Sequence, residues 1–194
     1  TSSATYRDMW AALRAGQVWK GEFINRRKNG EIYWEESQIA PIRDANGMVT
    51  HYVGVKTDIT ERKRSEEQLR LAASVFIHAR EGIMITDANG LIIDVNQAFS
   101  SITGYSRDDV LGQNPRILRS NRHDQSFYAS LWRDLHANDF WSGEIWNNRK
   151  SGDAYPEHLT ISVVRDDRGT PCQFVALFSD ISERKALEEK ALKL

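Results

Sequence analysis

The sequence has little of several features that would point to a particular class of protein. Its 194 residues include one cysteine, Cys172, so an intrachain disulfide is impossible and a reducing, cytoplasmic location is expected. No apolar run approaches the roughly 20 residues of a membrane-spanning helix, and no signal peptide is recognised at the N-terminus. We expect no membrane contact by this segment, and the sequence leaves open an anchor elsewhere in a longer parent protein.

The sequence also lacks an excess of charge of either sign. It has 26 Lys and Arg residues against 27 Asp and Glu residues, and the net charge of −1 gives no electrostatic basis for binding nucleic acid. The basic run Arg62-Lys63-Arg64 lies among acidic residues, which is typical of a solvent-exposed helix face. We therefore expect no nucleic-acid partner.

Motifs for catalysis are missing as well. The chain has no P-loop and no nucleophile elbow. Its five scattered histidines have no cysteine partners, so no metal site is predicted. We expect a regulatory segment without catalytic residues of its own, with any enzymatic activity in another part of the parent protein.

What the sequence does contain is an internal repeat. The segment Asp180–Lys185 echoes Asp58–Lys63 at an offset of 180 − 58 = 122 residues. Aligned without gaps at that offset, Trp19–Lys63 and Trp141–Lys185 are identical at 19 of 45 positions, against roughly one in twenty expected by chance. The chain thus carries the same unit twice, and the first copy is expected to begin before the given sequence does.

Each copy ends in a pattern that predicts three antiparallel strands joined by short turns. In the first copy, apolar residues at helical spacing predict a helix over residues 6–15. Strands are then expected at residues 19–25, 31–42 and 48–58. Residues 61–79 contain no Gly or Pro and predict a long helix, with Thr60 as its N-cap.

The second copy is preceded by a segment that predicts a complete domain. Strands are expected at residues 82–87 and 91–96, helices at 97–103, 108–111 and 125–136, and the three-strand pattern at 141–180. This order predicts an α+β fold, in which a five-stranded antiparallel sheet carries short helices on one face. A ligand would lie between the sheet and the helices.

Several short motifs stand at the turns and strand ends of this pattern. In the second copy they are Asp87-Ala88-Asn89-Gly90, Thr103-Gly104-Tyr105, Trp141-Ser142-Gly143-Glu144, Asn147-Asn148-Arg149-Lys150 and Asp180-Ile181-Ser182-Glu183-Arg184. In the first copy they are Trp19-Lys20-Gly21-Glu22, Asn25-Arg26-Arg27-Lys28 and Asp58-Ile59-Thr60-Glu61-Arg62. Together they resemble the PAS superfamily, as two tandem PAS units of a bacterial signalling protein, each with its C-terminal PAC segment and the first one truncated.

The resemblance divides the chain into four parts. Residues 1–59 correspond to the C-terminal half of the first PAS unit, 60–80 to a linker helix, 81–181 to the complete second unit and 182–194 to an output helix. It implies a homodimeric sensory module that relays a cue through its terminal helix to an output domain. The tail resembles linkers that lead into cyclic-di-GMP enzymes and into histidine kinases, and the sequence leaves both open.

Members of this family couple the sheet to the exit helix through the Asp-Ile-Thr/Ser-Glu-Arg stretch. The resemblance implies ion pairs Asp58–Arg62 and Asp180–Arg184, which would fix the exit angle of each helix. Apolar residues follow at the seven- and four-residue spacing of a coiled-coil seam, namely Leu69 and Ala72 in one helix and Leu187, Ala191 and Leu194 in the other. A helix that packs on its own domain is the alternative.

The resemblance also bears on a flavin cofactor. Light-sensing LOV members use a cysteine where this chain has Pro115, so the photoadduct cannot form there, and Cys172, expected on a late strand, cannot replace it. Glu157 stands where LOV domains have a second asparagine. FAD-binding redox sensors are a closer match. By that resemblance the candidate flavin contacts are Asn114, Arg116, Trp132, Trp141 and Asn147.

Other interpretations of the same residues stay open. The two tryptophans are also what a hydrophobic core would contain, and the pocket of a cofactor-free dimerisation or interaction module would be filled by its own side chains. Haem is a further alternative, because some PAS sensors use a histidine on the long helix, where His136 falls. Its position near the end of that helix favours a solvent-facing side chain.

Overall fold

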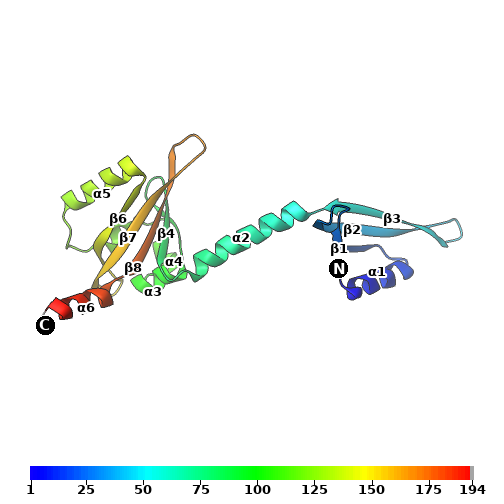
Figure 1. The fold of residues 1–194 in the computed structure, drawn as a ribbon, viewed down its shortest axis with the longest axis horizontal. Helices are drawn as coiled ribbons and strands as arrows, with labels where there is room; N and C mark the ends of the chain where they lie inside the picture. Colours follow the sequence, from blue (N-terminus) through cyan, green and yellow to red (C-terminus); the bar gives the residue numbers. More distant parts are fainter. Residues whose placement is uncertain (193–194) are drawn as a thin grey trace. The chain divides into compact units, whose positions relative to one another are not determined.

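The computed structural model describes residues 1–192, which fall into two compact units that divide between Ala72 and Ala73. The last position of the predicted helix seam, Leu194, and the end of the predicted output helix lie outside the described residues. Figure 1 labels most of the helices and strands of both units.

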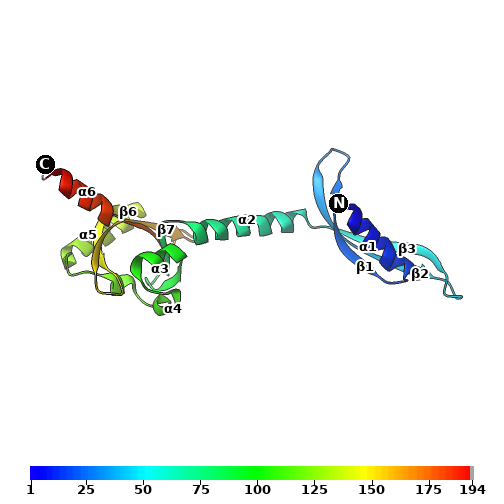
Figure 2. The ribbon, with the colours of Figure 1, turned by 90° about the horizontal axis from the view of Figure 1, so that it is seen from below.

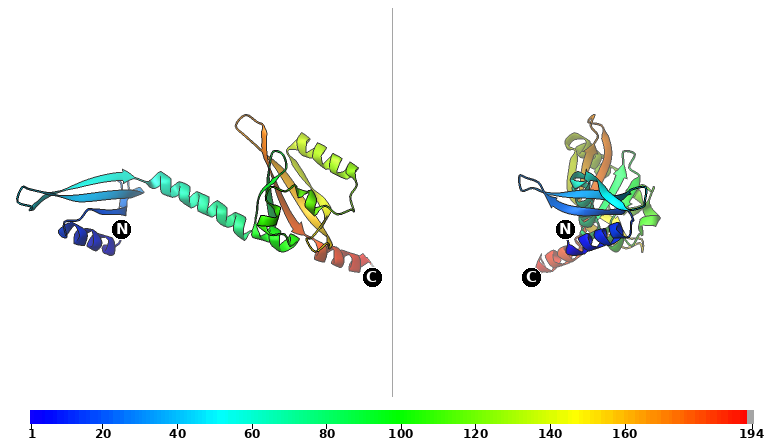
Figure 3. Two further views of the ribbon diagram at one scale, coloured as in Figure 1. Left: turned by 180° about the vertical axis from the view of Figure 1, so that it is seen from behind. Right: turned by 90° about the vertical axis from the view of Figure 1, so that its right-hand side faces the viewer.

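The first unit is a three-stranded antiparallel sheet with one helix against it. Its elements are α1 (Ser3–Arg14), β1 (Trp19–Arg26), β2 (Ile32–Arg43) and β3 (Val49–Asp58), and the strand order is β1-β2-β3. Met9 and Leu13 of α1 are buried against Trp19 and Phe23 of β1. The three predicted strands and both turns are confirmed, and two views of this sheet appear in Figure 3.

The helix α2 (Thr60–His78) begins directly after the last strand of this sheet. The predicted N-cap is wrong, because Thr60 is the first helical residue. Its hydroxyl donates to Asp58 Oδ1 at 2.6 Å and accepts from the backbone N–H of Trp34 at 3.0 Å. The carboxylate two residues earlier is the stronger acceptor, so the hydroxyl fastens the helix start to the sheet instead of capping it.

The second unit is an α+β domain, as predicted. It comprises β4 (Gly82–Asp87), β5 (Ile92–Val95), α3 (Gln97–Thr103), α4 (Arg107–Val110), the 3₁₀-helix η1 (Pro115–Leu118), α5 (Gln125–Asn138), β6 (Phe140–Asn148), β7 (Ala154–Arg165), β8 (Pro171–Asp180) and α6 (Ser182–Leu192). The five strands form one antiparallel sheet in the order β5-β4-β8-β7-β6. Figure 2 shows α3 and α4 next to one another beneath the strands.

Local sequence explains where the short helices of the second unit begin and end. Asn96 caps α3 by accepting from the N–H of Phe99, and Gly104 ends the helix at φ 79°, which only glycine adopts freely. Ser106 and Asp109 form a reciprocal capping box on α4. The core then closes around Phe99, which is fully buried and meets Phe178 edge to face at 5.8 Å between ring centroids.

Across the described residues, no helix combines the length and the apolar character that a membrane crossing needs. The same part of the chain holds no group of three or more His, Cys, Asp or Glu side chains that could bind a metal ion.

Candidate functional site

A cavity of about 340 Å³ lies between the sheet and the helices of the second unit. Strands β4, β6, β7 and β8 supply its sheet side, and η1 and α5 supply the opposite side. The volume falls within the range of sites that bind small organic molecules. Its position is the one that the predicted layer arrangement requires.

Most of the cavity wall is apolar. The residues that make it so are Met84, Leu118, Leu131, Ile145, Leu159, Ile161, Phe174, Ala176 and Phe178. On β7, side chains of alternate residues point to the same face of the sheet, so Glu157 and Leu159 share the cavity side. An aromatic or aliphatic ligand body would be buried favourably against such walls.

The polar centre of the cavity is a buried carboxylate. Glu157 is 2 % exposed. Its Oε1 accepts from Asn147 Nδ2 at 2.8 Å, and its Oε2 accepts from the hydroxyl of Tyr155 at 2.6 Å. Burial raises the pKa of Glu157 to about 7, and the two hydrogen bonds oppose the shift only in part. The group therefore exchanges its proton near neutral pH.

A second polar group at the cavity has no partner. The hydroxyl oxygen of Tyr128, on α5, is buried and makes no hydrogen bond among the described residues. The guanidinium of Arg119 lies 3.8 Å from the centre of its ring. Burial raises the pKa of Tyr128, so the hydroxyl keeps its proton and offers a donor to a ligand.

Four of the five predicted flavin contacts line the cavity, namely Asn114, Arg116, Trp132 and Asn147. Asn114 already uses its amide locally, since Nδ2 donates to Gly90 O at 3.3 Å and Oδ1 accepts from Arg116 N at 3.1 Å. Trp132 is 39 % exposed and meets Phe174 edge to face. Contact of these residues with a flavin stays a prediction.

The fifth residue, Trp141, lies elsewhere. It is not among the cavity residues and packs partly buried against the core, edge to face with Phe127. Its ring covers Gly143 so closely that an added Cβ would lie 2.8 Å away. The Trp-Ser-Gly motif therefore has a packing role here, because the glycine leaves room for the ring two residues earlier.

The structure also places Pro115, Cys172 and His136, the residues that bear on a LOV photoadduct and on haem. Pro115 opens η1 and lines the cavity at the position where a LOV domain has its cysteine. Cys172 lies on β8, as predicted, and donates weakly to Val164 O. His136 is exposed, as expected, and also lines the cavity, with Nδ1 bonded to the carbonyl of Trp132.

The junction between sheet and exit helix corrects the predicted ion pairs. Asp180 is bound by Arg149, whereas Arg184 pairs with Glu144 and with Glu188. An Asp180–Arg184 pair is therefore wrong. Asp180 accepts from Ser182 N and Oγ at 2.8 and 2.6 Å on Oδ1, and Arg149 donates to Oδ2, so both carboxylate oxygens are engaged.

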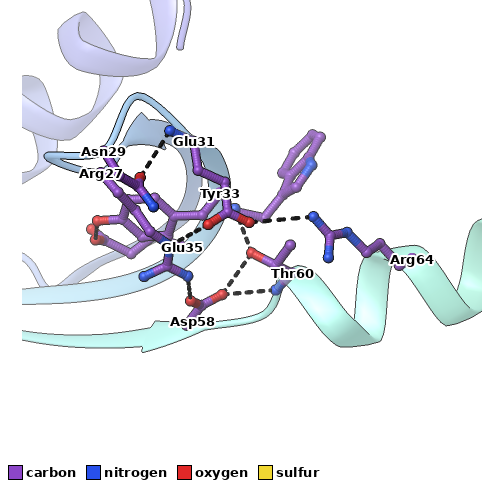
Figure 4. Close-up of polar contacts among 9 residues, drawn as sticks. Arg27, Asn29, Glu31, Tyr33, Glu35, Asp58, Thr60 and Arg64 are labelled. Carbon is purple, nitrogen blue, oxygen red and sulfur yellow. Dashed lines mark hydrogen bonds and ion pairs between the residues drawn. The ribbon is translucent and has the colours of Figure 1, made fainter.

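The first unit repeats this arrangement with its own residues, as Figure 4 shows. Asp58 is bound by Arg27 and Thr60, and these bonds, led by that of Thr60, lower the pKa of Asp58 to about 2. Arg62 pairs with Glu36, Glu22 and Glu66, so the Asp58–Arg62 pair is wrong as well. In both units the aspartate contacts an arginine that directly follows a strand, Arg27 after β1 and Arg149 after β6.

Sequence reasoning missed the role of Tyr155, Arg149 and Glu144 in the second unit. A signal was present, because Tyr-x-Glu recurs at the repeat offset as Tyr33-Trp34-Glu35. A charged residue on a strand, two positions from an aromatic one and on the same face, is worth examining as a buried group. By sequence alone, Glu157 stands out only as a departure from LOV domains.

Comparison with known families finds two matches. A family model described as PAS domain matches residues 80–183, which is more than half of the chain, and one described as PAS fold matches residues 2–56. Both units of the repeat are thus matched.

Three known proteins are informative. The nitrogen fixation regulatory protein of Klebsiella oxytoca is 35% identical over 112 residues, 58% of this chain and 23% of that protein. Biofilm dispersion protein BdlA of Pseudomonas aeruginosa is 26% identical over 184 residues, 94% of this chain and 44% of that protein. The chain therefore spans less than half the length of these relatives. The LOV domain of a blue-light activated histidine kinase from Erythrobacter litoralis matches with TM-score 0.50 and 27% identity, covering 54% of this chain and 99% of that domain.

Proposed function

The chain belongs to the PAS domain family, and from that premise we propose that it is a sensory module whose second unit binds a small-molecule or redox cue and relays it through α6. That the chain is a sensory signalling module follows from its family. The cue, the cofactor and the receiving domain are the proposal. One observation carries it: the cavity of about 340 Å³ holds a buried carboxylate, a buried amide and an unpartnered tyrosine hydroxyl among apolar walls.

FAD is the cofactor that these residues fit. The cavity side chains combine apolar walls for a planar ring with donors and acceptors for its polar edge, from Asn147, Tyr128 and Glu157. Arg116 and Asn114 at η1 and Trp132 on α5 would hold the parts nearer the surface. When bound, a flavin would supply reversible redox chemistry. The chain's own residues would orient it and keep water from its ring.

The relay to a separate output domain is the second part of the proposal. The exit helix α6 is fastened to the sheet by Glu144, which binds both Arg184 and Lys185. A ligand that shifts β6 therefore acts directly on the start of α6. The receiving domain is a cyclic-di-GMP enzyme or a histidine kinase, the two kinds of protein whose linkers the tail resembles.

An absorption spectrum of freshly purified protein, produced with ample flavin, tests the cofactor. We expect the visible bands of oxidised flavin, released as FAD on denaturation. Asn147→Ala should reduce the flavin content at least severalfold, and Trp141→Phe, off the cavity, should not. A featureless spectrum would reject flavin, and equal loss in both variants would reject this cavity as its site.

A cofactor-free dimerisation module is the second candidate, and exposed apolar residues on α2 favour it. Leu69 is 71% exposed and Val75 63% exposed in the single chain. A helix with such residues gains by packing against a second copy. Light scattering on the wild type and on Leu69→Lys tests whether α2 forms a dimer interface. A wild-type dimer that dissociates in the variant would support the interface, and a monomeric wild type would reject it.

A further inference from the structure

The carboxyl group of Glu157 is joined by contacts to the first residue of the exit helix. The Tyr155 hydroxyl bonds to Glu157, and the Tyr155 ring lies under the guanidinium of Arg149, 4.2 Å from its centre. Arg149 donates to the carboxylate of Asp180. Asp180 in turn accepts from the N–H and the hydroxyl of Ser182, where α6 begins. We name these residues, Glu157, Tyr155, Arg149, Asp180 and Ser182, the relay chain.

We infer that the second unit is also a proton sensor, in which protonation of Glu157 inside the cavity rearranges the contacts of the relay chain and so alters the start of α6. The proton comes from solvent and converts the carboxylate to a neutral carboxyl group. The inference needs no bound ligand, so it stands apart from the proposed flavin.

The geometry makes protonation a structural event. As a carboxylate, Glu157 accepts one hydrogen bond on each oxygen, from two different strands. When one oxygen gains a proton it becomes a donor and a poorer acceptor, so the bond from Asn147 or from Tyr155 has to rearrange. A shift of the Tyr155 ring displaces the guanidinium of Arg149, which is stacked on that ring. Arg149 binds the carboxylate of Asp180, and this carboxylate accepts the hydrogen bonds from Ser182.

Several other groups face Glu157 or its cavity. Asn147 on β6 and Tyr155 on β7 donate to it, Tyr128 and His136 come from α5, and Arg116 and Arg119 come from η1 and the residue after it. The charge of Asp180 disfavours ionisation of Glu157, and that of Arg149 favours it. Arg149 is already engaged by Asp180, and among the described residues no cation bonds to Glu157 itself. Burial therefore decides its proton affinity.

The first unit contains the same contacts without the sensor. Tyr33 donates to Glu35, Arg27 lies 4.4 Å from the centre of the Tyr33 ring, and Arg27 binds Asp58. Here Lys56 lies 3.0 Å from Glu35, at the repeat position of Phe178 in the second unit. The ammonium group keeps Glu35 ionised at neutral pH.

Hydrogen exchange of the ligand-free full chain, corrected for intrinsic rates, tests the inference across about pH 6 to about pH 8. In the wild type, the protection of the amides at residues 182–186 should change severalfold with pH. The midpoint of this change should coincide with the pKa of Glu157 measured by carbon-13 NMR. Glu157→Gln should abolish the change. Tyr155→Phe should leave Glu157 titrating but uncouple α6, because it removes only the connecting hydroxyl.

Glu35→Gln is the matched control and should retain the full response of α6. The inference is overturned if Glu157 does not titrate in this range, or if α6 responds equally in Tyr155→Phe and wild type. Should Glu157→Gln fail to fold, the Tyr155→Phe variant and the titration of the wild type still decide. A spectrum without flavin bands would reject the proposed cofactor but would not affect these measurements, which use ligand-free protein. The two proposals can therefore be rejected independently of one another.

Discussion

The two units place the same tyrosine–glutamate pair in different surroundings. Glu35 is 4 % exposed, and Glu157 is 2 % exposed, so both carboxylates are buried. Burial alone would raise the pKa of Glu35, but hydrogen bonds from Lys56, Ser37 and Tyr33 outweigh it and lower the pKa. Glu157 has apolar neighbours at the two repeat positions, Phe178 and Leu159, and its pKa rises.

This difference shows that burial by itself does not set the charge of a buried acid. Hydrogen bonds from one cation and two hydroxyl groups together reverse the direction of the shift. The ionised form of a buried carboxylate is destabilised when such bonds are too few, which raises its pKa. Groups with perturbed pKa values are often found at functional sites. The first unit thus carries a fixed charge, and the second carries a group that can change.

The largest effect is expected from Glu157→Gln. The pKa of Glu157 rises from an unfolded value of 4.5 to about 7, so between these values the native state binds more protons than the unfolded state. Wild-type stability therefore falls as pH rises through this window, by about 3 kcal/mol. Urea unfolding should show the variant equal to wild type near pH 4.5 and more stable at pH 8.

The matched substitution in the first unit, Glu35→Gln, should act with the opposite sign. The pKa of Glu35 is lower in the folded than in the unfolded protein. Ionised Glu35 therefore contributes stability that is fully present above the unfolded-state pKa and is lost as the pH falls through the folded-state pKa. The variant should be less stable than wild type at neutral pH. A gain of stability in both variants at pH 8 would contradict the comparison.

A smaller effect is expected when the cation of the first unit is removed. Lys56→Met keeps the length of the side chain and leaves Glu35 without its charged partner. We expect a loss of about 1–2 kcal/mol, moderated because the lysine is 60% exposed. Carbon-13 NMR should show the pKa of Glu35 rising above 4.5, toward the behaviour of Glu157. An unchanged pKa would show that Ser37 and Tyr33 suffice.

The repeat also pairs Tyr128 with Tyr6. The buried hydroxyl of Tyr128 lacks a partner, so Tyr128→Phe should raise the stability of the ligand-free protein by about 1 kcal/mol. Tyr6 is 43% exposed, and Tyr6→Phe should change stability by less than about 0.5 kcal/mol. Thermal unfolding of both variants measures the difference. A loss in Tyr128→Phe would mean that the hydroxyl is hydrogen-bonded in solution.

The smallest effect is expected at the exit helices. Glu144→Gln removes the surface ion pairs to Arg184 and Lys185, which should change global stability little and loosen the first turn of α6. Glu22→Gln is the matched change for α2, where Glu22 pairs with Lys63 and Arg62. Hydrogen exchange at high and low salt should show both effects weakening with salt, and salt-independent loosening would point to another cause.

Much of the fold could be predicted from local patterns. The strands, the short turns between them and the short helices depend on neighbours in sequence, and the structure confirms them. Four of the five candidate flavin residues line one cavity, because the family pattern already places the segments that contain them around the space between sheet and helices. Trp141 could not be placed this way, since its motif is also satisfied by packing over Gly143.

The contacts of charged side chains were not predictable in the same way. Asp180 and Arg184 are one helical turn apart, a spacing that favours a pair, yet Asp180 pairs with Arg149 just after β6 and Arg184 pairs with Glu144 in β6. Surface ion pairs are individually weak and a long arginine side chain can reach several acids, so the fold, which brings Arg149 to Asp180, decides which pair forms.

The sequence by itself determined the tandem repeat, the order of elements and the presence of an acid at the same place in both units, because these depend on residue type and spacing. Only the tertiary structure decided that one acid meets a lysine while the other is enclosed by apolar side chains. The physical reason is that burial and Coulomb interaction depend on distance in space, and residues far apart in the chain supply both.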